Sequence, residues 1–414
     1  MPIRYLRMLM TRRMAVILLQ GFASGLPLAL IGSTLQAWFA VSGVDVLTIG
    51  VLSLAGQPYV FKFLWAPIFD RYVLPFLGRR RGWLFMTQAL LMLIVIFFTF
   101  LDPVEHALLI GIIAFFVAFF SATQDILVDA YRTELLVQHE FGVGVSLYNA
   151  GYRVAMLVSG GGALIFADYF GWQAMFLTMA GLFAVQLLVT VWAEEPQHEG
   201  RPEALHHAVI HPFHDFFKRH FAWWILLFIL LYKLTDVITL SLGSKFLIDL
   251  GFNLTTIGAV YKGVGLITTL CGAFIGGYIM SRLTIYRSLI SFGLLQAFSN
   301  LTFAWLALVG ANLAVLTIAV AAESFCSGLA TTAFVAFLMS LCNKRYTATQ
   351  YALFSSLAVF GRVYVGPFAG FLARFLHVET YTTHWFYFYV IAFVLGFPAL
   401  LLLMWLRKKD AVSQ

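Results

Sequence analysis

Charged residues are scarce in this chain of 414 residues: only 11% are Asp, Glu, Lys or Arg, whereas 61% are hydrophobic. An average soluble domain is about a quarter charged. Several of the few charges fall inside long apolar runs. This composition excludes an ordinary soluble domain and indicates a membrane protein with a polar interior pathway.

Other scarcities narrow the possible functions. The three cysteines, Cys271, Cys326 and Cys342, lie in apolar runs without paired spacing, which favours core residues over disulfides. All ten histidines lie in loops or near the ends of apolar runs, so an enzyme with an intramembrane catalytic His is disfavoured. His207 and His211 could chelate a metal, but their surroundings favour an amphipathic surface helix, and we expect no metal site. No phosphate-binding loop of the Walker type is present, so we expect no nucleotide cofactor.

The apolar runs are long enough to cross a bilayer. A helix needs about 20 apolar residues to span roughly 30 Å of hydrocarbon, and backbone groups in lipid must be paired. The runs therefore predict an all-α polytopic membrane protein of twelve transmembrane helices, near residues 14–41, 46–69, 82–101, 106–133, 143–168, 171–193, 222–250, 254–281, 288–309, 312–342, 350–375 and 382–406.

The basic residues predict the orientation. They lie in loops that follow even-numbered spans, namely Arg71, Arg79, Arg80, Arg81, Arg201, Lys218, Arg219, Arg282, Arg287, Lys344, Arg345, Arg407, Lys408 and Lys409. Because such loops are usually cytoplasmic, both termini are predicted to be cytoplasmic. The net charge of +7 is scattered over short loops, so it reports topology and not nucleic-acid binding.

The chain is internally duplicated. Thr48-Ile49-Gly50 recurs as Thr256-Ile257-Gly258, and Arg153 matches Arg362 at nearly the same offset. This repeat predicts an N-terminal six-helix bundle (1–193), a cytoplasmic linker with an amphipathic helix (194–221) and a C-terminal six-helix bundle (222–414). A duplication of six plus six helices resembles the major facilitator superfamily, which implies a substrate site between two pseudo-symmetric bundles near the bilayer midplane.

One loop strengthens this resemblance. Asp70-Arg71, followed by Gly78-Arg79-Arg80-Arg81, is similar to the cytoplasmic signature loop of the superfamily, although the gap before the basic cluster is longer. A carboxylate beside several guanidiniums predicts a gating latch formed by Asp70, Arg71, Arg79, Arg80 and Arg81. A plain positive-inside anchor is the alternative, and both can hold.

Nine charges lie well inside the predicted spans, away from their ends, and spans three, six, nine and twelve contain none. Each would cost about 2.5 to 3.5 kcal/mol if it faced lipid at a helix centre, so we expect all nine to face inward. They are Lys62, Asp125, Asp129, Arg153, Lys233, Asp236, Lys262, Glu323 and Arg362.

Three of these acids are candidates for proton coupling. Ser121, Asp125, Asp129 and Arg132 form one polar stripe along span four, and Asp125 or Asp129 is the preferred proton site. Glu323, which is alone in span ten, is the other candidate. Lys233 and Asp236 are three residues apart and are interpreted as a structural ion pair.

Seven short segments form a distinctive set: 21–30 (GFASGLPLAL), 34–38 (TLQAW), 59–65 (YVFKFLW), 78–83 (GRRRGW), 124–126 (QDI), 341–344 (LCNK) and 361–367 (GRVYVGP). Together they resemble the AmpG-type muropeptide permeases. The resemblance implies a monomeric, proton-driven importer in the bacterial inner membrane. Its substrate would be an anhydro-muropeptide, GlcNAc-anhydroMurNAc with or without peptide, used in cell-wall recycling and β-lactamase induction.

The residue types suit such a substrate. Aromatic and amide groups suit a sugar, for which Gln36, Trp38, Gln57, Tyr59, Gln124 and Asn149 are the candidates. Cations suit peptide carboxylates, for which Lys62, Arg153, Lys262 and Arg362 are the candidates.

Two alternatives stay open. The segment 123–130 (TQDILVDA) is also similar to span four of acetyl-CoA transporters, and a cationic cavity would accept that anion. A membrane receptor that binds wall fragments without transporting them is the other possibility. Some AmpG-type proteins continue into additional C-terminal helices, whereas this sequence stops after Arg407-Lys408-Lys409 and its last five residues.

Overall fold

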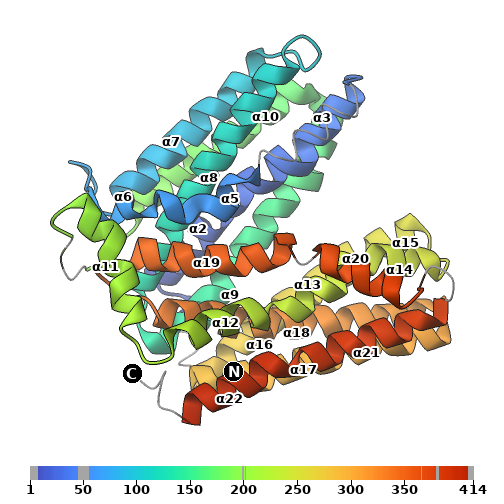
Figure 1. Cartoon of the computed structure of the whole chain (residues 1–414). Coiled ribbons are helices and arrows are strands. Elements are labelled where there is room, and N and C mark those ends of the chain that lie inside the picture. The colour runs from blue at the N-terminus through green and yellow to red at the C-terminus, as the bar shows by residue number, and fades with distance from the viewer. Residues whose placement is uncertain are drawn as a thin grey trace. The chain divides into compact units, whose positions relative to one another are not determined.

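The computed structural model describes residues 8–44, 56–197, 200, 202–364, 366–378 and 382–408, without the side chains of 361–364, 366, 367 and 382. Within these ranges every regular element is a helix (Figure 1). The repeat at Thr48-Ile49-Gly50, the loop residues Arg201 and Lys409, and the side chain of Arg362 lie outside the described residues.

Nine described segments are long and apolar enough to cross a membrane. They include ten of the twelve predicted spans, because spans five and six are joined in Gln138–Trp192. Gly171, with φ 82°, interrupts the helical backbone of that segment close to the predicted break. Spans two and eleven include residues outside the described ranges. The prediction of a polytopic helical membrane protein is confirmed.

The contacts of the chain divide it into two compact units. Unit 1 contains residues up to 138 together with 147–213 and 341–356, and unit 2 contains 139–146, 214–340 and the residues from 357 onward. Residues 341–356 therefore pack with the N-terminal helices. The predicted boundaries at 193 and 222 stay a prediction.

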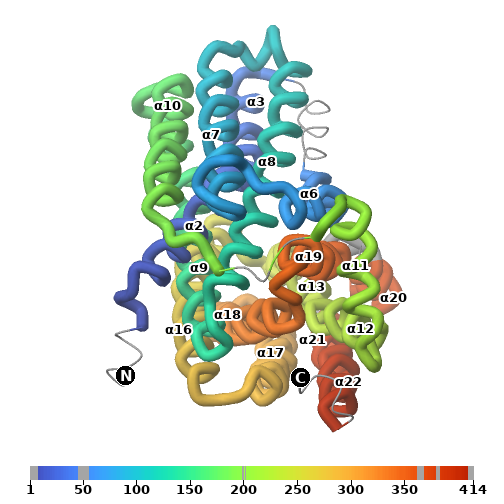
Figure 2. The backbone as a smooth tube through the Cα atoms, turned by 90° about the vertical axis from the view of Figure 1, so that its left-hand side faces the viewer, coloured from blue at the N-terminus to red at the C-terminus, as the bar shows by residue number. Residues whose placement is uncertain are grey.

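Helices α2, α7, α8 and α10 form the main bundle of unit 1 (Figure 2). Trp38 packs on Phe176 in the core of this unit, with ring centroids 5.0 Å apart. Its described helices are α2 (Arg12–Ala29), η1 (Leu30–Thr34), α3 (Leu35–Val41), α5 (Pro58–Phe61), η3 (Lys62–Leu64), α6 (Ala66–Arg71), α7 (Arg81–Phe97), η4 (Phe98–Phe100), α8 (Ala107–Leu135), η5 (Gln138–Glu140), α9 (Phe141–Leu157), η6 (Val158–Gly162), α10 (Ala163–Trp192) and α11 (Leu205–Phe217), some of which extend into unit 2.

Helices α16, α17, α18 and α21 form the main bundle of unit 2. Its core contains Phe246, Phe303 and Tyr389, whose aromatic rings pack together. The helices after α11 are α12 (Ala222–Tyr232), α13 (Leu234–Ser241), α14 (Gly243–Asp249), α15 (Leu254–Ala259), η7 (Val260–Gly265), α16 (Leu266–Met280), α17 (Ile285–Val309), α18 (Leu313–Ser340), α19 (Thr347–Tyr364), α20 (Gly366–Phe375), η8 (Thr382–His384), α21 (Trp385–Leu395) and α22 (Phe397–Lys408), of which α19 begins in unit 1.

Glycines let helices approach closely in both units. A Cβ atom on Gly21 or Gly25 of α2 would overlap backbone atoms of Tyr148 or Tyr152 on α9, and one on Gly272 of α16 would overlap Phe325 on α18. Side chains larger than hydrogen are therefore excluded at these crossings. Gly370 differs from them, because a Cβ there would meet nothing within 4 Å.

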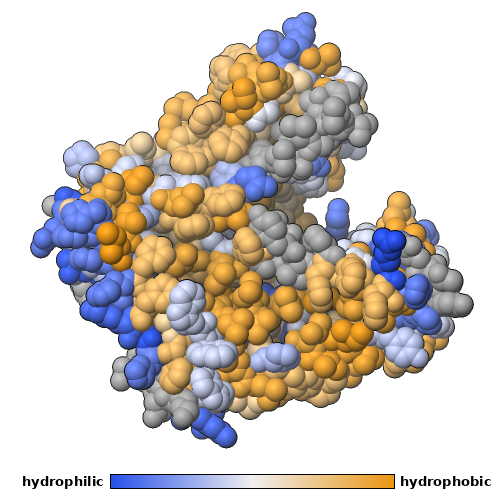
Figure 3. All heavy atoms as spheres, in the orientation of Figure 1, coloured by the Kyte–Doolittle hydropathy of each residue, from blue (hydrophilic) through white to orange (hydrophobic). Residues whose placement is uncertain are grey.

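The surface matches a lipid environment. Many large apolar side chains are exposed, such as Leu93 on α7, Ile165 on α10 and Trp223 on α12. Hydrophobic residues cover most of the visible face of α21, while hydrophilic residues gather near α11 (Figure 3). Helix α11 exposes Val209 and Ile210, as the amphipathic interpretation predicted.

Candidate functional site

A cluster of buried charges lies along α8 in unit 1. Asp129 accepts a hydrogen bond from Nη2 of Arg132 at 2.7 Å, and its other oxygen lies 3.7 Å from Nζ of Lys62. Lys62 comes from η3, which the preceding short helix α5 brings against α8. We call Lys62, Asp125, Asp129 and Arg132 the Asp129 cluster. Two of the predicted site residues, Lys62 and Asp129, are thus brought together.

Aromatic side chains hold Arg132 in place. Its guanidinium lies 4.3 Å from the ring centre of Tyr148 on α9 and donates a hydrogen bond of 2.8 Å to the hydroxyl of Tyr351 on α19. A guanidinium over an aromatic ring gains cation–π energy, which is larger in a desolvated site. Arg132 is only 2% exposed, so the cluster presents a fixed positive charge.

Asp125 lies one helical turn before Asp129, beside Ser24 of α2. Its Oδ1 atom is buried and has no hydrogen-bond partner. A buried carboxylate oxygen without a donor is costly unless the group is neutral or meets a ligand. Asp125 therefore carries an unmatched buried oxygen, whereas Asp129 is paired with Arg132 and Lys62.

Amide and aromatic groups surround this part of α8. Tyr59 donates a hydrogen bond of 2.8 Å to Ser121, and Trp65 donates one of 3.0 Å to Thr123. Gln124 is fully buried, and both its amide nitrogen and its amide oxygen are without partners. Nearby is a cavity of about 330 Å³, lined by Gln57, Pro58, Phe61, Trp65, Phe115, Phe116 and Phe119.

The other predicted substrate contacts are not part of this cluster. Trp38 is 5% exposed in the core of unit 1, and Gln36 is half-buried on α3. Asn149 and Arg153 lie on α9, where Asn149 is half-buried and Arg153 is exposed. Lys262 is exposed in η7 of unit 2. Their roles stay predictions.

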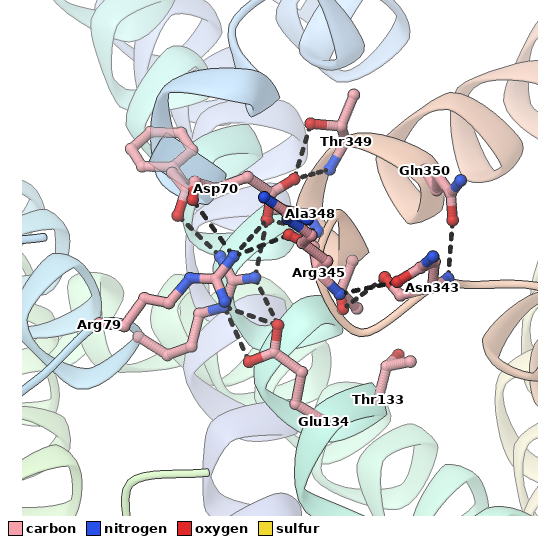
Figure 4. A network of polar contacts seen from close by, with 12 residues as sticks. Asp70, Arg79, Thr133, Glu134, Asn343, Arg345, Ala348, Thr349 and Gln350 are labelled. Carbon is pink, nitrogen blue, oxygen red and sulfur yellow. Dashed lines mark hydrogen bonds and ion pairs between the residues drawn. The ribbon is translucent and has the colours of Figure 1, made fainter. Parts of the chain in front are cut away.

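The predicted latch is a buried network at the end of α6 (Figure 4). Oδ1 of Asp70 accepts from Nη2 of Arg79 at 3.2 Å and from Nη2 of Arg80 at 2.8 Å. Glu134, at the end of α8, binds the same Arg80 through both carboxylate oxygens. Arg80 is fully buried. Burial alone would lower its pKa, but the carboxylates of Glu134 and Asp70 outweigh that effect and raise the pKa above its ordinary value.

Asp70 also binds the beginning of α19. Its carboxylate accepts hydrogen bonds from the backbone N–H groups of Ala348 and Thr349, at 3.2 and 2.8 Å, and from the Thr349 hydroxyl at 2.7 Å. A carboxylate at a helix N-terminus satisfies backbone donors that have no partner within the helix. Asp70 therefore joins α6 to α19 as well as to the two arginines.

Two of the five latch residues lie elsewhere. The guanidinium of Arg71 packs on the ring of Tyr72 at 5.5 Å, and that of Arg81 donates to the backbone carbonyls of Thr190 and Val191. Within the described residues neither is bonded to Asp70, because Arg71 is held at Tyr72 and Arg81 at the end of α10. The joint role of the five residues as a latch stays a prediction, with Arg71 and Arg81 outside the bonded network around Asp70.

Three partners were missed by the sequence reasoning: Glu134, Thr349 and Tyr351. Glu134 lies two residues beyond the polar stripe of α8, so its acidic side chain near the helix end was a usable signal. Thr349 and Tyr351 are common residue types more than 200 residues from their partners, and no local pattern points to them.

Comparisons with known proteins agree with this geometry. The family model of the Major Facilitator Superfamily matches residues 13–366. The anhydromuropeptide permease of Escherichia coli strain K12 is 46% identical over 411 residues, which cover 99% of this chain and 82% of the relative. A putative transporter, AmpG 4, of Rickettsia felis is 34% identical, over 96% of this chain and 97% of the relative.

Solved structures support the fold alone, because their identities are low. The proton:xylose symporter XylE has a TM-score of 0.70 at 14% identity and covers 94% of each chain. A bacterial homologue of ferroportin in an outward-facing state has a TM-score of 0.72 at 15% identity, over 96% of this chain and 100% of the other. With permeases as relatives, the prediction of a transporter and not an enzyme is confirmed, and the chain belongs to the Major Facilitator Superfamily as one of its AmpG-type permeases.

Proposed function

We propose that this multi-pass membrane transporter imports anhydromuropeptides, GlcNAc-anhydroMurNAc with or without peptide, across the bacterial inner membrane. A proton gradient drives the import, the termini are cytoplasmic, and the imported fragments serve wall recycling and β-lactamase induction. The strongest support is the 46% identity to an anhydromuropeptide permease over nearly the whole chain.

The Asp129 cluster supports both parts of the proposal. Lys62 and Arg132 supply positive charge suited to a peptide carboxylate, and the unpartnered amide of Gln124 suits a sugar hydroxyl. Asp125, with its unpartnered oxygen, is our preferred proton carrier. The bond between Asp129 and its cations would weaken when a substrate carboxylate competes for Arg132.

The network around Asp70 is proposed to act as the cytoplasmic latch. It joins α6 to the start of α19, which is the beginning of predicted span eleven. Movement of α19 would therefore break three hydrogen bonds at Asp70 and leave Arg79 and Arg80 to hold the carboxylate.

Uptake of labelled GlcNAc-anhydroMurNAc into proteoliposomes tests the function. We expect accumulation only with an inward proton gradient, no competition by excess acetyl-CoA, and loss of accumulation in Asp125→Asn. Asp102→Asn, in an exposed loop, is the matched control and should keep wild-type uptake. Strong competition by acetyl-CoA would favour the organic-anion alternative, and binding without accumulation would favour the receptor.

A further inference from the structure

A second buried polar cluster lies in unit 2, halfway along three helices. Asp236 belongs to α13, Gln296 to α17 and Glu323 to α18, and they are 8%, 5% and 2% exposed. The candidate spans that contain them run over Ala222–Asp249, Ile285–Val309 and Leu313–Ser340, so all three side chains are near mid-span. Burying polar groups at that depth in a membrane protein costs free energy, so such groups mark a candidate functional site.

Each of these three side chains has one buried oxygen without a hydrogen-bond donor. The atoms are Oδ1 of Asp236, Oε1 of Gln296 and Oε1 of Glu323. Asp236 and Gln296 also line one small cavity of about 10 Å³, enough for roughly one water molecule. The Gln296 side chain is within hydrogen-bonding reach of Glu323. Three unmatched acceptors in one buried region require additional positive charge or donors.

The cluster contains too few cations for its acids. Lys233 donates to Oδ2 of Asp236 at 3.0 Å and to the Thr331 hydroxyl at 2.8 Å. Glu323 accepts a hydrogen bond from the Ser324 hydroxyl at 3.2 Å. If both acids were ionised, two negative charges would share one positive charge in a buried site, and like charges so placed cannot both persist.

The remaining titratable neighbours of Glu323 do not supply a cation. They are Tyr261 in η7, Tyr389 in α21 and Cys326 on the same helix. Phenols and thiols have ordinary pKa values of about 10 and 8.5, so they are neutral near pH 7. Of the groups that act most strongly on Glu323, Asp236 and Lys233 carry charge.

We propose that Asp236, Gln296 and Glu323 form a second proton-binding site, in which Glu323 takes up one proton from water and Lys233 neutralises Asp236. The charges then sum to zero. A proton on Oε1 of Glu323 turns one unmatched acceptor into a donor, and Gln296, with its amide turned so that the oxygen meets Glu323, can accept from it. One proton therefore resolves two of the three unmatched oxygens, and Asp236 lines the small cavity.

This site is separate from Asp125. Its role in transport rests on the proposed proton-coupled function, whereas proton binding at Glu323 can be measured whether or not the protein transports. Infrared spectra of the substrate-free protein in lipid, recorded between about pH 5 and about pH 9, report protonated carboxyl groups directly. Because a protonated Asp125 would give a band of its own, the spectra are recorded in Asp125→Asn protein. In that background we expect a carboxyl C=O band that is lost on adding Glu323→Gln, changes its titration pH on adding Asp236→Asn, and is unaffected by the control Asp102→Asn.

A second variant protects the test against misfolding. Gln296→Leu keeps both carboxyls but removes the acceptor, so it should shift the same band without abolishing it. A band that persists unchanged in folded Glu323→Gln would overturn the proposal. So would a spectrum that responds to sodium ions at constant pH, because the site would then bind a metal cation.

Uptake then separates this site from the proposed function. Each coupled proton multiplies the limiting accumulation about tenfold per unit of pH difference, since one pH unit is one factor of ten. If the Glu323 proton is coupled, Glu323→Gln lowers the limiting accumulation about tenfold. If wild-type protein shows the carboxyl band but no uptake, the proposed import function is contradicted and the proposed proton site is not.

Discussion

The two units treat their buried acids differently. In unit 1, Asp129 is paired with Lys62 and Arg132, and Asp70 with Arg79 and Arg80. In unit 2, Lys233 is the single cation of a cluster that holds Asp236 and Glu323. Apart from Asp125, our proposed proton carrier, these buried acids of unit 1 are held by counter-charge, whereas Glu323 in unit 2 has no cation of its own and is proposed to bind a proton. Acidic side chains that are buried to a similar degree can therefore either stay ionised beside a cation or bind a proton.

The largest effect is expected where counter-charge is removed from unit 1. Arg80→Ala leaves Glu134 without its guanidinium and takes one cation from Asp70. Removing one partner of a buried pair costs about 3 to 5 kcal/mol. Denaturant titration in detergent micelles should show that loss in the free energy of unfolding. Arg71→Ala is the matched control and should change it by less than about 0.5 kcal/mol.

The intramembrane cluster of unit 1 gives the next effect. Asp129→Asn leaves Lys62 and Arg132 buried without their carboxylate. We expect the free energy of unfolding to fall by about 3 kcal/mol, near the lower limit for a broken buried pair, because Tyr148 and Tyr351 still contact Arg132. An unchanged unfolding midpoint would show that the cations are solvated, and the contrast between the units would fail.

Packing should affect both units equally, although their charges differ. Gly25→Ala and Gly272→Ala each place a Cβ against a neighbouring backbone, so each should cost about 1 to 3 kcal/mol. The same titration measures both. Gly181→Ala on α10 is the control: its Cβ would meet nothing within 4 Å, so the higher helix propensity of Ala should stabilise the protein by up to about 1 kcal/mol.

The smallest effect is expected at Glu323. If this side chain is neutral, Glu323→Gln replaces one neutral polar group by another of similar size, and the free energy of unfolding near pH 7 should change by less than about 1 kcal/mol. A loss of 3 kcal/mol or more would mean that an ionised Glu323 stabilises Lys233. That result would make the two units alike.

The candidate site could be predicted only in part. Lys62 and Asp129 were both selected because charges inside apolar runs are rare, and they proved to be neighbours. Trp38 was selected by residue type, but it packs in the core. Asp236 was interpreted as half of a structural pair, and its link to Gln296 and Glu323 depends on three helices whose register the sequence does not state.

The order of residues specified the helical membrane fold and which charges lie inside apolar spans, but not which of them are buried. Arg153 and Lys262 are exposed, whereas Arg80 of a predicted loop is fully buried. Hydropathy acts along a single segment, and the thickness of the hydrocarbon layer sets its length. Which charged side chains contact one another was set by the packing of the helices. This packing bound Asp70 to the start of α19 and to Arg79 and Arg80, and it left Arg71 on Tyr72. Pairing depends on the rotation and crossing of helices that are far apart in the chain, and short-range Coulomb and hydrogen-bond energies change within an ångström or two.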